Sequence, residues 1–446
     1  MKRGPGQVLL AFLLAGCGPL LRQQPEVPAE SFIEPVNMLP LPGQLDAEPL
    51  LHSNNPERIE RPGVLLSTLP GAAGPFLNHA LTGTFSVFLH HLARTPVFDG
   101  RRLWIGLLAH NHGPETLRID LNQGNAFLTW PDAPFISLAT QLPNDSGQVF
   151  AGPGDRVALA TLRGESSLPV QNWELAPGSD TLLFQWLVPT NPLLFVQQDN
   201  ALSALLRFHA SAGIDLSLVA LLQSDTPGAS DWLAMLNTGQ RAGPADGEAT
   251  LYDPTKPPPA GPFRFSRVAG LTQGARWQGM LEIDLAQFNR QAYPVSGLYL
   301  KDLETHQNQS AQLLARIPGS AVESHGNYGV HYQLKLQLNN SSSHARNLSL
   351  ALQQPLKVKD AKAEFRRKPS EQVRFRGSLK LTHGGQSRYY HLVLHEGEQA
   401  QPFASLSLPP QTSEQALLEW VYPPDATPPQ LLTIATGPER PAEPSS

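Results

Sequence analysis

Apolar and polar side chains alternate most regularly in the stretch Gly329–Gln354. Every second residue from Val330 to Leu338 is apolar, and this period of two puts one apolar row on one face of a strand. The polar run Asn339–Ser343 favours a chain reversal, because these side chains bond their own backbone in turns. The alternation restarts over Leu348–Leu352. The pattern predicts a β-hairpin, which needs a second sheet to cover its apolar face.

The same pattern occurs earlier in the chain. Leu103–Ala109 alternates, His110–Thr116 reads as a turn, and Leu117–Leu121 alternates again. A second pair of segments, Leu175–Pro189 and Leu408–Pro424, keeps nearly the same offset, and each contains a Pro turn, a Leu-Leu pair and a Trp. Matches in the same order at a common offset indicate an internal duplication. Antiparallel sandwiches also converge on such patterns, so convergence is the alternative.

Short apolar runs between Pro and Gly turns are typical of an all-β fold. They predict two antiparallel β-sandwich (Ig-like) domains, the first over residues 48–229 and the second over residues 263–437. The polar, Pro-rich tail 438–446 is expected to be disordered.

The two sandwiches are expected to be joined by the segment 230–262. Ser230 can cap one short linking helix, Asp231–Asn237, which would end at Gly239. The Pro-rich strip Asp253–Pro262 then reads as the linker between the domains.

The N-terminus carries the features of a bacterial lipoprotein signal, residues 1–16. Its apolar core, Val8–Leu14, is too short to span a bilayer. The following Leu-Ala-Gly before Cys17 resembles a lipobox, in which the chain is cut before the cysteine and the thiol is acylated. Acyl chains would hold the protein on a membrane without a spanning helix, and the Pro-rich residues 17–47 would form a tether. An ordinary secretion signal with an incidental cysteine is the alternative.

Composition narrows the classes of function. The chain of 446 residues carries a net charge of -5 and no basic run. Binding of nucleic acid is therefore not expected, because it needs clustered Lys and Arg side chains. Cys17 is the one cysteine, so an internal disulfide and a Cys-based metal site are both excluded.

Six motifs stand in order along the chain: LPLPGQLD (39–46), PDAPFI (131–136), GQVFAGPGDRV (147–157), RVAGLTQGARW (267–277), SHGNYGV (324–330) and YPPDATPPQ (422–430). With them the chain resembles a family of cyanobacterial envelope proteins classed only as domain of unknown function 3370. The likeness runs from about Leu39 to the end of the chain. The family has no assigned activity, so the resemblance implies location and extent and no catalytic residue.

The histidines do not form a recognisable metal or catalytic set. His90 and His91 are neighbours on a predicted strand, so they point to opposite faces and cannot chelate together. His110 and His112 can share a face, but two imidazoles make a poor zinc site, and a solvated turn is the favoured interpretation. Hydrolase-elbow, zinc-protease and phosphate-loop motifs are absent from the sequence, and GPGD at 152–155 reads as a turn without a helix after it. We expect no catalytic residue, metal or cofactor.

Three aromatic residues are candidates for ligand binding. Trp104 faces away from the apolar row of its strand, Trp277 lies in a Gly-rich segment, and Tyr328 lies in the loop between His325 and Gly329. Exposed rings could stack on sugars, although a Trp is more often part of a core.

The sequence therefore favours an exported, lipid-anchored cell-envelope protein that faces the periplasm or cell surface. Its expected role is structural or adhesive, and its expected partner is an envelope polysaccharide or protein. The alternative is a hydrolase of wall or sheath glycan with paired carboxylates, which leave no signature in sequence.

Overall fold

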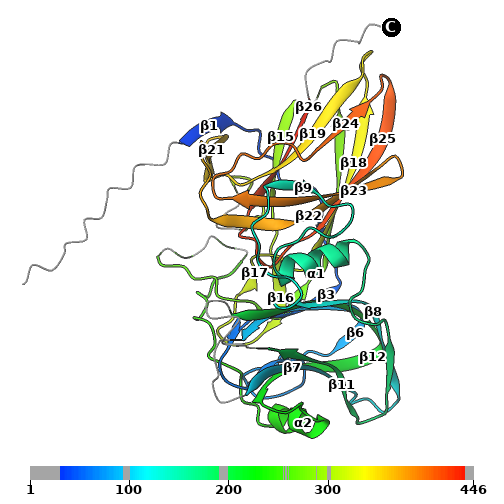
Figure 1. Cartoon of the computed structure of the whole chain (residues 1–446), viewed down its shortest axis with the longest axis vertical. Helices are drawn as coiled ribbons and strands as arrows, with labels where there is room; N and C mark the ends of the chain where they lie inside the picture. Colours follow the sequence, from blue (N-terminus) through cyan, green and yellow to red (C-terminus); the bar gives the residue numbers. More distant parts are fainter. Residues whose placement is uncertain are drawn as a thin grey trace, which may run out of the picture.

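The computed structural model describes residues 31–93, 101–189, 199–254, 256, 259, 261–287, 289–298 and 303–436. This part of the chain is mostly β-strand, arranged in several sheets, with two helices (Figure 1). The predicted signal peptide, Cys17 and the tail 438–446 lie outside the described residues.

The largest sheet has 12 strands and lies in the lower part of Figure 1. Its main path runs in the order β10-β8-β12-β6-β3-β13-β16-β17, and four further strands pair off this path. The strands are β3 (Pro49–Ser53), β4 (Arg58–Ile59), β5 (Gly63–Ser67), β6 (Leu81–Ala93), β7 (Arg102–His110), β8 (Leu117–Leu128), β10 (Asn172–Leu175), β11 (Asp180–Val188), β12 (Asn200–Gln223), β13 (Ala269–Gln273), β16 (Ala311–Arg316) and β17 (Glu323–Ser324).

Two further sheets, of seven and four strands, form most of the upper part. The first has the order β2-β14-β18-β25-β22-β23-β9, and the second β15-β26-β19-β24. Their strands are β2 (Gln44–Leu45), β9 (Gln141–Pro143), β14 (Arg276–Asp284), β15 (Arg290–Val295), β18 (His331–Asn340), β19 (Arg346–Gln353), β22 (Val373–His383), β23 (Gln386–His395), β24 (Ala404–Leu408), β25 (Thr412–Val421) and β26 (Gln430–Thr436).

The smallest sheet has three strands in the order β1-β21-β20. It is built from β1 (Ser31–Pro35), β20 (Lys357–Lys359) and β21 (Lys362–Arg366). Its inner face carries a small apolar cluster that includes Val36, Ala363 and Phe365.

The predicted hairpin at Gly329–Gln354 is wrong, although both of its strands form. β18 pairs with β14 and β25 in the seven-stranded sheet, whereas β19 pairs with β24 and β26 in the four-stranded sheet. Leu334 and Leu350 from the two strands are fully buried in one core. The chain therefore crosses from one sheet to the other at this corner. The hairpin prediction failed because alternation defines the apolar face of a strand and not the strand with which it pairs.

The earlier copy of the pattern shows the same arrangement. β7 pairs with β11 and β12, while β8 pairs with β10 and another part of β12. The pairing of β7 with β11 and of β8 with β10 thus corresponds to that of β18 with β25 and of β19 with β24. Strand β12 serves both sides: Leu202–Ala210 pairs with β6 and β8, and Asp215–Gln223 pairs with β7.

A buried asparagine stands at each corner. The Asn111 Nδ2 atom donates to the carbonyls of Glu115, Leu175 and Ala176 at 2.8–3.1 Å, and its Oδ1 accepts from the N–H of Gly113.

The second corner repeats this arrangement. The Asn340 Nδ2 atom donates to the carbonyls of His344, Leu408 and Pro409 at 2.8–3.1 Å, and its Oδ1 accepts from the N–H of Ser342. Each side chain satisfies backbone groups that the corner removes from sheet pairing.

The helix α1 (Pro153–Leu162) corrects the prediction of a turn at 152–155. Pro153 begins the helix, Asp155 lies in its first turn, and residues such as Val157 and Leu162 are buried. A proline suits the first helical position, because its missing N–H would lack a partner there in any case. The apolar run that followed GPGD in the sequence is this helix, which packs against β8 and β12 on one side and β22 and β25 on the other (Figure 1).

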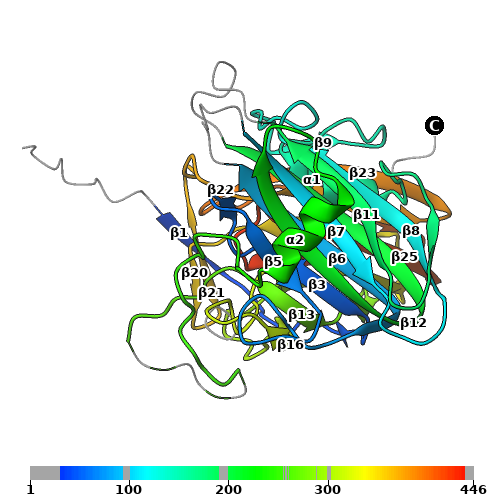
Figure 2. The same ribbon diagram turned by 90° about the horizontal axis from the view of Figure 1, so that it is seen from below.

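The helix α2 (Ala229–Asn237) confirms the predicted short helix, but its cap differs. Gly228 is the N-cap, and its N–H donates to Asp231 Oδ2 at 2.8 Å, whereas Ser230 lies inside the helix. Gly239 follows the helix with φ 61, as a glycine after a helix end often does. Figure 2 shows α2 lying across the face of the sheet that contains β7.

The segments on either side of 230–262 share sheets. Strand β13 pairs with β3, and strand β9, from the first half, pairs with β23. The largest core also joins the halves, since Phe88 and Leu205 pack in the same cluster as Trp277 and Tyr332. The expected split into two separate units at residues 230–262 therefore does not match the division into sheets.

The expected tether also extends too far along the chain. Within 31–47, β1 pairs with β21 and β2 pairs with β14, and Val36 and Leu41 are buried. Leu41 exchanges two hydrogen bonds of 2.8 Å with the side chain of Gln307. Pro35 is compatible with β1, which lies at the edge of its sheet, because the N–H that proline lacks is not needed on the open side of an edge strand.

Candidate functional site

The three aromatic candidates for ligand binding lie in the core. The exposed fractions of Trp104, Trp277 and Tyr328 are 8%, 4% and 9%. Trp104 packs against Trp232 and Leu236 of α2, which covers the sheet face that the sequence suggested was open. An exposed stacking surface at these three residues is therefore ruled out.

Trp277 and Tyr328 belong to the core between the halves. The Trp277 Nε1 atom donates to the Pro42 carbonyl at 3.1 Å, and the Tyr328 hydroxyl donates to the Ala426 carbonyl at 3.0 Å. Burial raises the pKa of Tyr328 to about 12. Gly329 has φ 82 and lies against Phe88, so the loop serves packing, and positive φ is the reason for glycine there.

His110 is buried, which corrects the prediction of a solvated turn, while His112 is exposed. The His110 Nδ1 atom lies 2.6 Å from Asp180 Oδ1, and its Nε2 lies 2.8 Å from Ser217 Oγ. These contacts have the connectivity of a Ser-His-Asp hydrolase triad. Burial lowers the pKa of His110, and the hydrogen bond to Asp180 partly offsets that effect.

The Ser217 hydroxyl is not placed to attack a substrate. Ser217 and Ser67 are both fully buried, and their Oγ atoms lie 2.8 Å apart. A cavity of about 400 Å³ beside His110 is lined by Asp180 and the end of α2, but not by Ser217. A serine nucleophile must reach the carbonyl carbon, so this network connects β5, β7, β11 and β12 and leaves no access to its hydroxyl.

Three other buried histidines, His90, His91 and His391, also have structural contacts. His90 Nδ1 lies 2.7 Å from Ser203 Oγ, and His91 Nε2 lies 2.9 Å from Ser53 Oγ, so the neighbours bind different strands, in keeping with the prediction that they cannot chelate together. His391 Nε2 lies 2.8 Å from Asp155 Oδ2 and ties β23 to α1. Within the described residues there is no group of three or more His, Cys, Asp or Glu side chains that could hold a metal ion.

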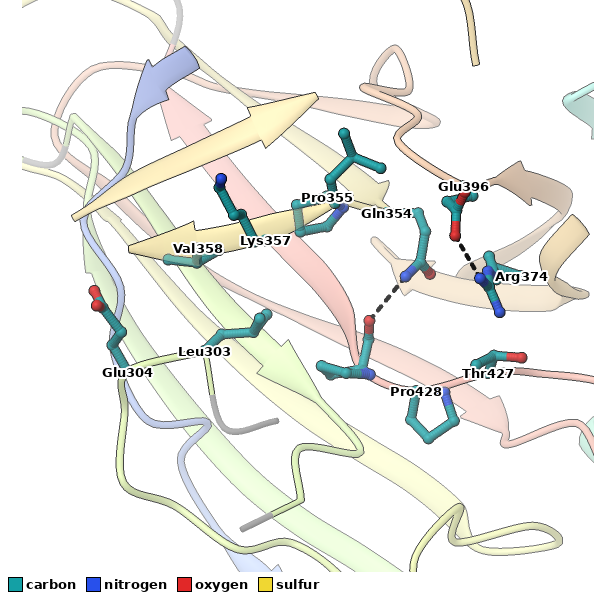
Figure 3. Close-up of a pocket in the computed structure, with 12 residues that line it drawn as sticks. Leu303, Glu304, Gln354, Pro355, Lys357, Val358, Arg374, Glu396, Thr427 and Pro428 are labelled. Carbon is teal, nitrogen blue, oxygen red and sulfur yellow. Dashed lines mark hydrogen bonds and ion pairs between the residues drawn. The ribbon is translucent and has the colours of Figure 1, made fainter. Parts of the chain in front are cut away.

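The best candidate for a ligand site is a groove of about 380 Å³ between the three-stranded sheet and the neighbouring loops (Figure 3). Figure 3 shows Lys357 and Val358 of β20 on one side and Thr427 and Pro428 on the other. Segments far apart in sequence thus build one concavity, of the volume that small-ligand sites occupy. Its lining residues are Leu303, Glu304, Gln354, Pro355, Leu356, Lys357, Val358, Arg374, Glu396, Thr427, Pro428 and Pro429.

Arginines neutralise the acid at the back of the groove. Glu396 forms ion pairs with Arg374 and with Arg366. The hydrogen bond from Arg374 is the main reason that the pKa of Glu396 lies below its usual value, so this carboxylate stays ionised at neutral pH. Such a group can hold a donor, but it is a poor general acid.

The remaining polar groups shape the groove. Glu304 Oε1 accepts the N–H of Asp360 at 3.0 Å and so holds the β20–β21 turn. The Gln354 Nε2 atom donates to the Pro429 carbonyl at 3.3 Å, across the end of the groove (Figure 3). Prolines and aliphatic side chains form the rest of the wall.

A family model described as protein of unknown function (DUF3370) matches residues 36–436. The chain belongs to this family. No curated protein matches the chain. No helix among the described residues has the length and apolar character needed to cross a membrane.

Sequence reasoning missed the groove, because its lining comes from five separate segments. One signal was present: the segment 357–376 contains eight Lys and Arg residues and three Asp and Glu residues, a net charge of +5 in a chain of net charge -5. Apart from Arg366–Lys368, the cations of this segment are separated by other residues, as expected where side chains alternate between the two faces of a strand.

Proposed function

We propose that this protein is an exported, lipid-anchored envelope component whose folded part binds a polysaccharide or protein of the envelope. The proposal of an anchor rests on the lipobox that ends at Cys17. Acyl chains on that residue would keep the protein on a membrane, facing the periplasm or the cell surface.

The groove is the observation that carries the binding role. It has the volume of a ligand site, and its back carboxylate, Glu396, is held by Arg374 and Arg366. The groove combines aliphatic and proline side chains with ammonium, carboxylate and amide groups. Such a lining can bind an extended polar ligand, because it offers both packing surface and hydrogen-bond partners. A short segment of envelope glycan fits this lining best, with selectivity from hydrogen bonds, because none of the described residues that line the groove is aromatic.

The test uses the chain from Gly18 to Ser446, which keeps every described element. Calorimetric titration with purified wall and sheath glycans should show binding, and Thr427→Phe should weaken it about tenfold or more by filling the groove. Thr382→Phe, at a partly buried threonine on β22, is the matched control and should bind normally. Unchanged binding in Thr427→Phe would place the ligand elsewhere, and release of reducing ends from the glycan would favour a hydrolase.

The anchor has its own test. In cells, Cys17→Ser should move the protein from the membrane pellet to the soluble fraction, since the acyl chains would be lost. A variant that stays with membranes after a high-salt wash would contradict the anchor.

We further infer that the fold is a duplicated unit of two facing sheets, an arrangement of two Ig-like sandwiches joined through shared strands. The matched pairing of β7 with β11 and β18 with β25 supports this proposal, as do the corner asparagines. Convergence would not be expected to reproduce four side-chain hydrogen bonds at equivalent atoms.

A further inference from the structure

The three-stranded sheet has one apolar and one basic face. Phe32, Ala363 and Val358 point to the inner cluster. By alternation, the opposite face carries Ile33 of β1 with Lys357 and Lys359 of β20 and Lys362 and Glu364 of β21. The basic face consists of Ile33, Lys357, Lys359, Lys362 and Glu364, with the adjoining Lys368.

Most of the basic face is exposed and carries excess positive charge. Lys357, Lys359, Lys362 and Lys368 are all exposed. One acid on the face, Glu364, is matched by Lys357 at 2.9 Å. Within the described chain, no acidic side chain lies within ion-pair distance of Lys359, Lys362 or Lys368.

The same face carries an exposed apolar side chain. Ile33 is 61% exposed, and it lies directly opposite Glu364 in the pairing of β1 with β21. An apolar side chain among lysines is the combination that interfacial membrane segments use.

The position of the face relative to the N-terminus is the deciding observation. β1 begins at Ser31, and 13 residues separate it from Cys17. If Cys17 is acylated, this segment reaches roughly 40 Å at full extension, so the basic face must stay close to the bilayer.

We propose that the basic face lies against the anionic headgroups of the membrane that holds the chain. The proposal rests on the proposed lipid anchor for its choice of partner. Lysines attract anionic lipid within a Debye length of the surface, and Ile33 inserts among the headgroups. Contact would orient the folded part on the membrane, with the groove beside Lys357 at the membrane side.

An anionic polysaccharide is the competing partner, and it is less consistent with the face. A polyanion would use the lysines but would gain nothing from Ile33. A site for a soluble polyanion would also not need to lie in the same sheet as β1, the strand that follows the tether.

The test uses the unlipidated chain from Gly18 to Ser446, so it does not depend on acylation. Sedimentation with phosphatidylcholine vesicles that contain about 30% phosphatidylglycerol should show binding that is absent with phosphatidylcholine alone and falls with salt. Changing Lys359, Lys362 and Lys368 to Gln should lower the partition coefficient about a hundredfold. Ile33→Ser should lower it about fivefold, with a loss that persists at high salt.

The matched control removes three exposed cations elsewhere, with Arg58, Arg102 and Lys335 changed to Gln. It should bind vesicles nearly as well as the unchanged chain. Equal loss in the two triple variants, or equal binding to both kinds of vesicle, would overturn the proposal. So would capture of a soluble polyanion such as alginate without vesicle binding. If Cys17→Ser stayed with membranes in cells, the lipid anchor would be refuted, but the vesicle binding of the unlipidated chain would still stand.

Discussion

The asparagines at the two corners, Asn111 and Asn340, form equivalent hydrogen bonds to the backbone, but the residues around them differ. Immediately before each asparagine, a cross-strand pair occupies the same place: His110 with Asp180 in the first corner and Asn339 with Ser413 in the second. Each pair is joined by a contact of 2.6 Å between side chains. The asparagine is needed to satisfy the turned backbone, whereas its neighbour can be ionic or neutral.

The strands leading into the corners differ more. Counting back from the asparagines, Trp104 corresponds to Gln333 and Leu108 to Gln337. In the first half this outer face is apolar and covered by α2. In the second half, glutamine side chains of neighbouring strands form hydrogen bonds with one another, such as the bond of 2.8 Å that Gln415 donates to Gln337. One strand framework thus supports a covered face or an open one, depending on whether the chain supplies a helix.

The largest expected effect comes from separating the halves. Expression of residues 18–250 and 251–446 as separate chains should give two products without cooperative unfolding, because β13 would lose β3 and β23 would lose β9. Circular dichroism melts of each product and of the co-expressed pair would check this. Two independently folded products would mean that the shared sheets are dispensable.

Removal of either corner asparagine should cost a similar amount. Asn111→Ala and Asn340→Ala should each lower the free energy of unfolding by about 3 kcal/mol, because several buried backbone groups lose their partner. Asn339→Ala, beside the second corner and partly exposed, should cost less than about 1 kcal/mol. Urea denaturation would measure all three, and unequal costs for the two corners would weaken their equivalence.

A buried histidine should make the shared region sensitive to acid. Burial lowers the pKa of His52 to about 3, and both of its ring nitrogens are buried without a hydrogen-bond partner in the described structure. Since the folded-state pKa lies below the unfolded value, stability present above pH 6.5 is lost as the pH falls toward 3. His52→Phe should remove about 2 kcal/mol of the difference in stability between pH 7 and pH 5. An unchanged pH dependence would assign the acid sensitivity to other groups.

Asp425 should show the opposite dependence and a smaller effect. Burial raises the pKa of Asp425 to about 6, and its Oδ2 atom has no hydrogen-bond partner in the described structure. With a folded-state pKa above the unfolded value, its contribution is present at low pH and is lost as the pH rises through 6. Asp425→Asn should therefore stabilise the protein by about 1 kcal/mol at pH 8 and not at pH 4. Thermal melts at the two pH values would detect the difference.

The sequence predicted strands better than it predicted their partners. The alternation at Val330–Leu338 and Leu103–Ala109 correctly identified β18 and β7 and their apolar rows. The Trp residues that suggested the repeat are not equivalent, however. Trp186 lies opposite Ile105, whereas Trp420 lies opposite Tyr332, which is two positions further from its corner asparagine. One position comes from the extra residue of β11 between Leu182 and Phe184, and the other from the longer spacing between Ser413 and Trp420 than between Asp180 and Trp186.

The candidate site was largely beyond prediction from sequence. Trp104 alternates as an outward residue and does face outward from its own sheet, but nothing local indicates that α2 packs over it. His110 and Ser217 meet because β7 and β12 are neighbours, and Gln354 and Pro429 meet because β19 pairs with β26. These contacts depend on strand order, which side-chain alternation does not encode.

The sequence by itself determined the local features: which residues form strands, where α2 begins and ends to within two residues, and the family to which the chain belongs. Only the tertiary structure decided that the apparent hairpins are corners between sheets, that both halves share a core, and that the lysines of β20 and β21 lie on one face beside the N-terminal strand. The physical reason is range. Periodicity and turn chemistry act between residues a few positions apart, whereas sheet order and burial are set by the packing of apolar faces across the whole chain.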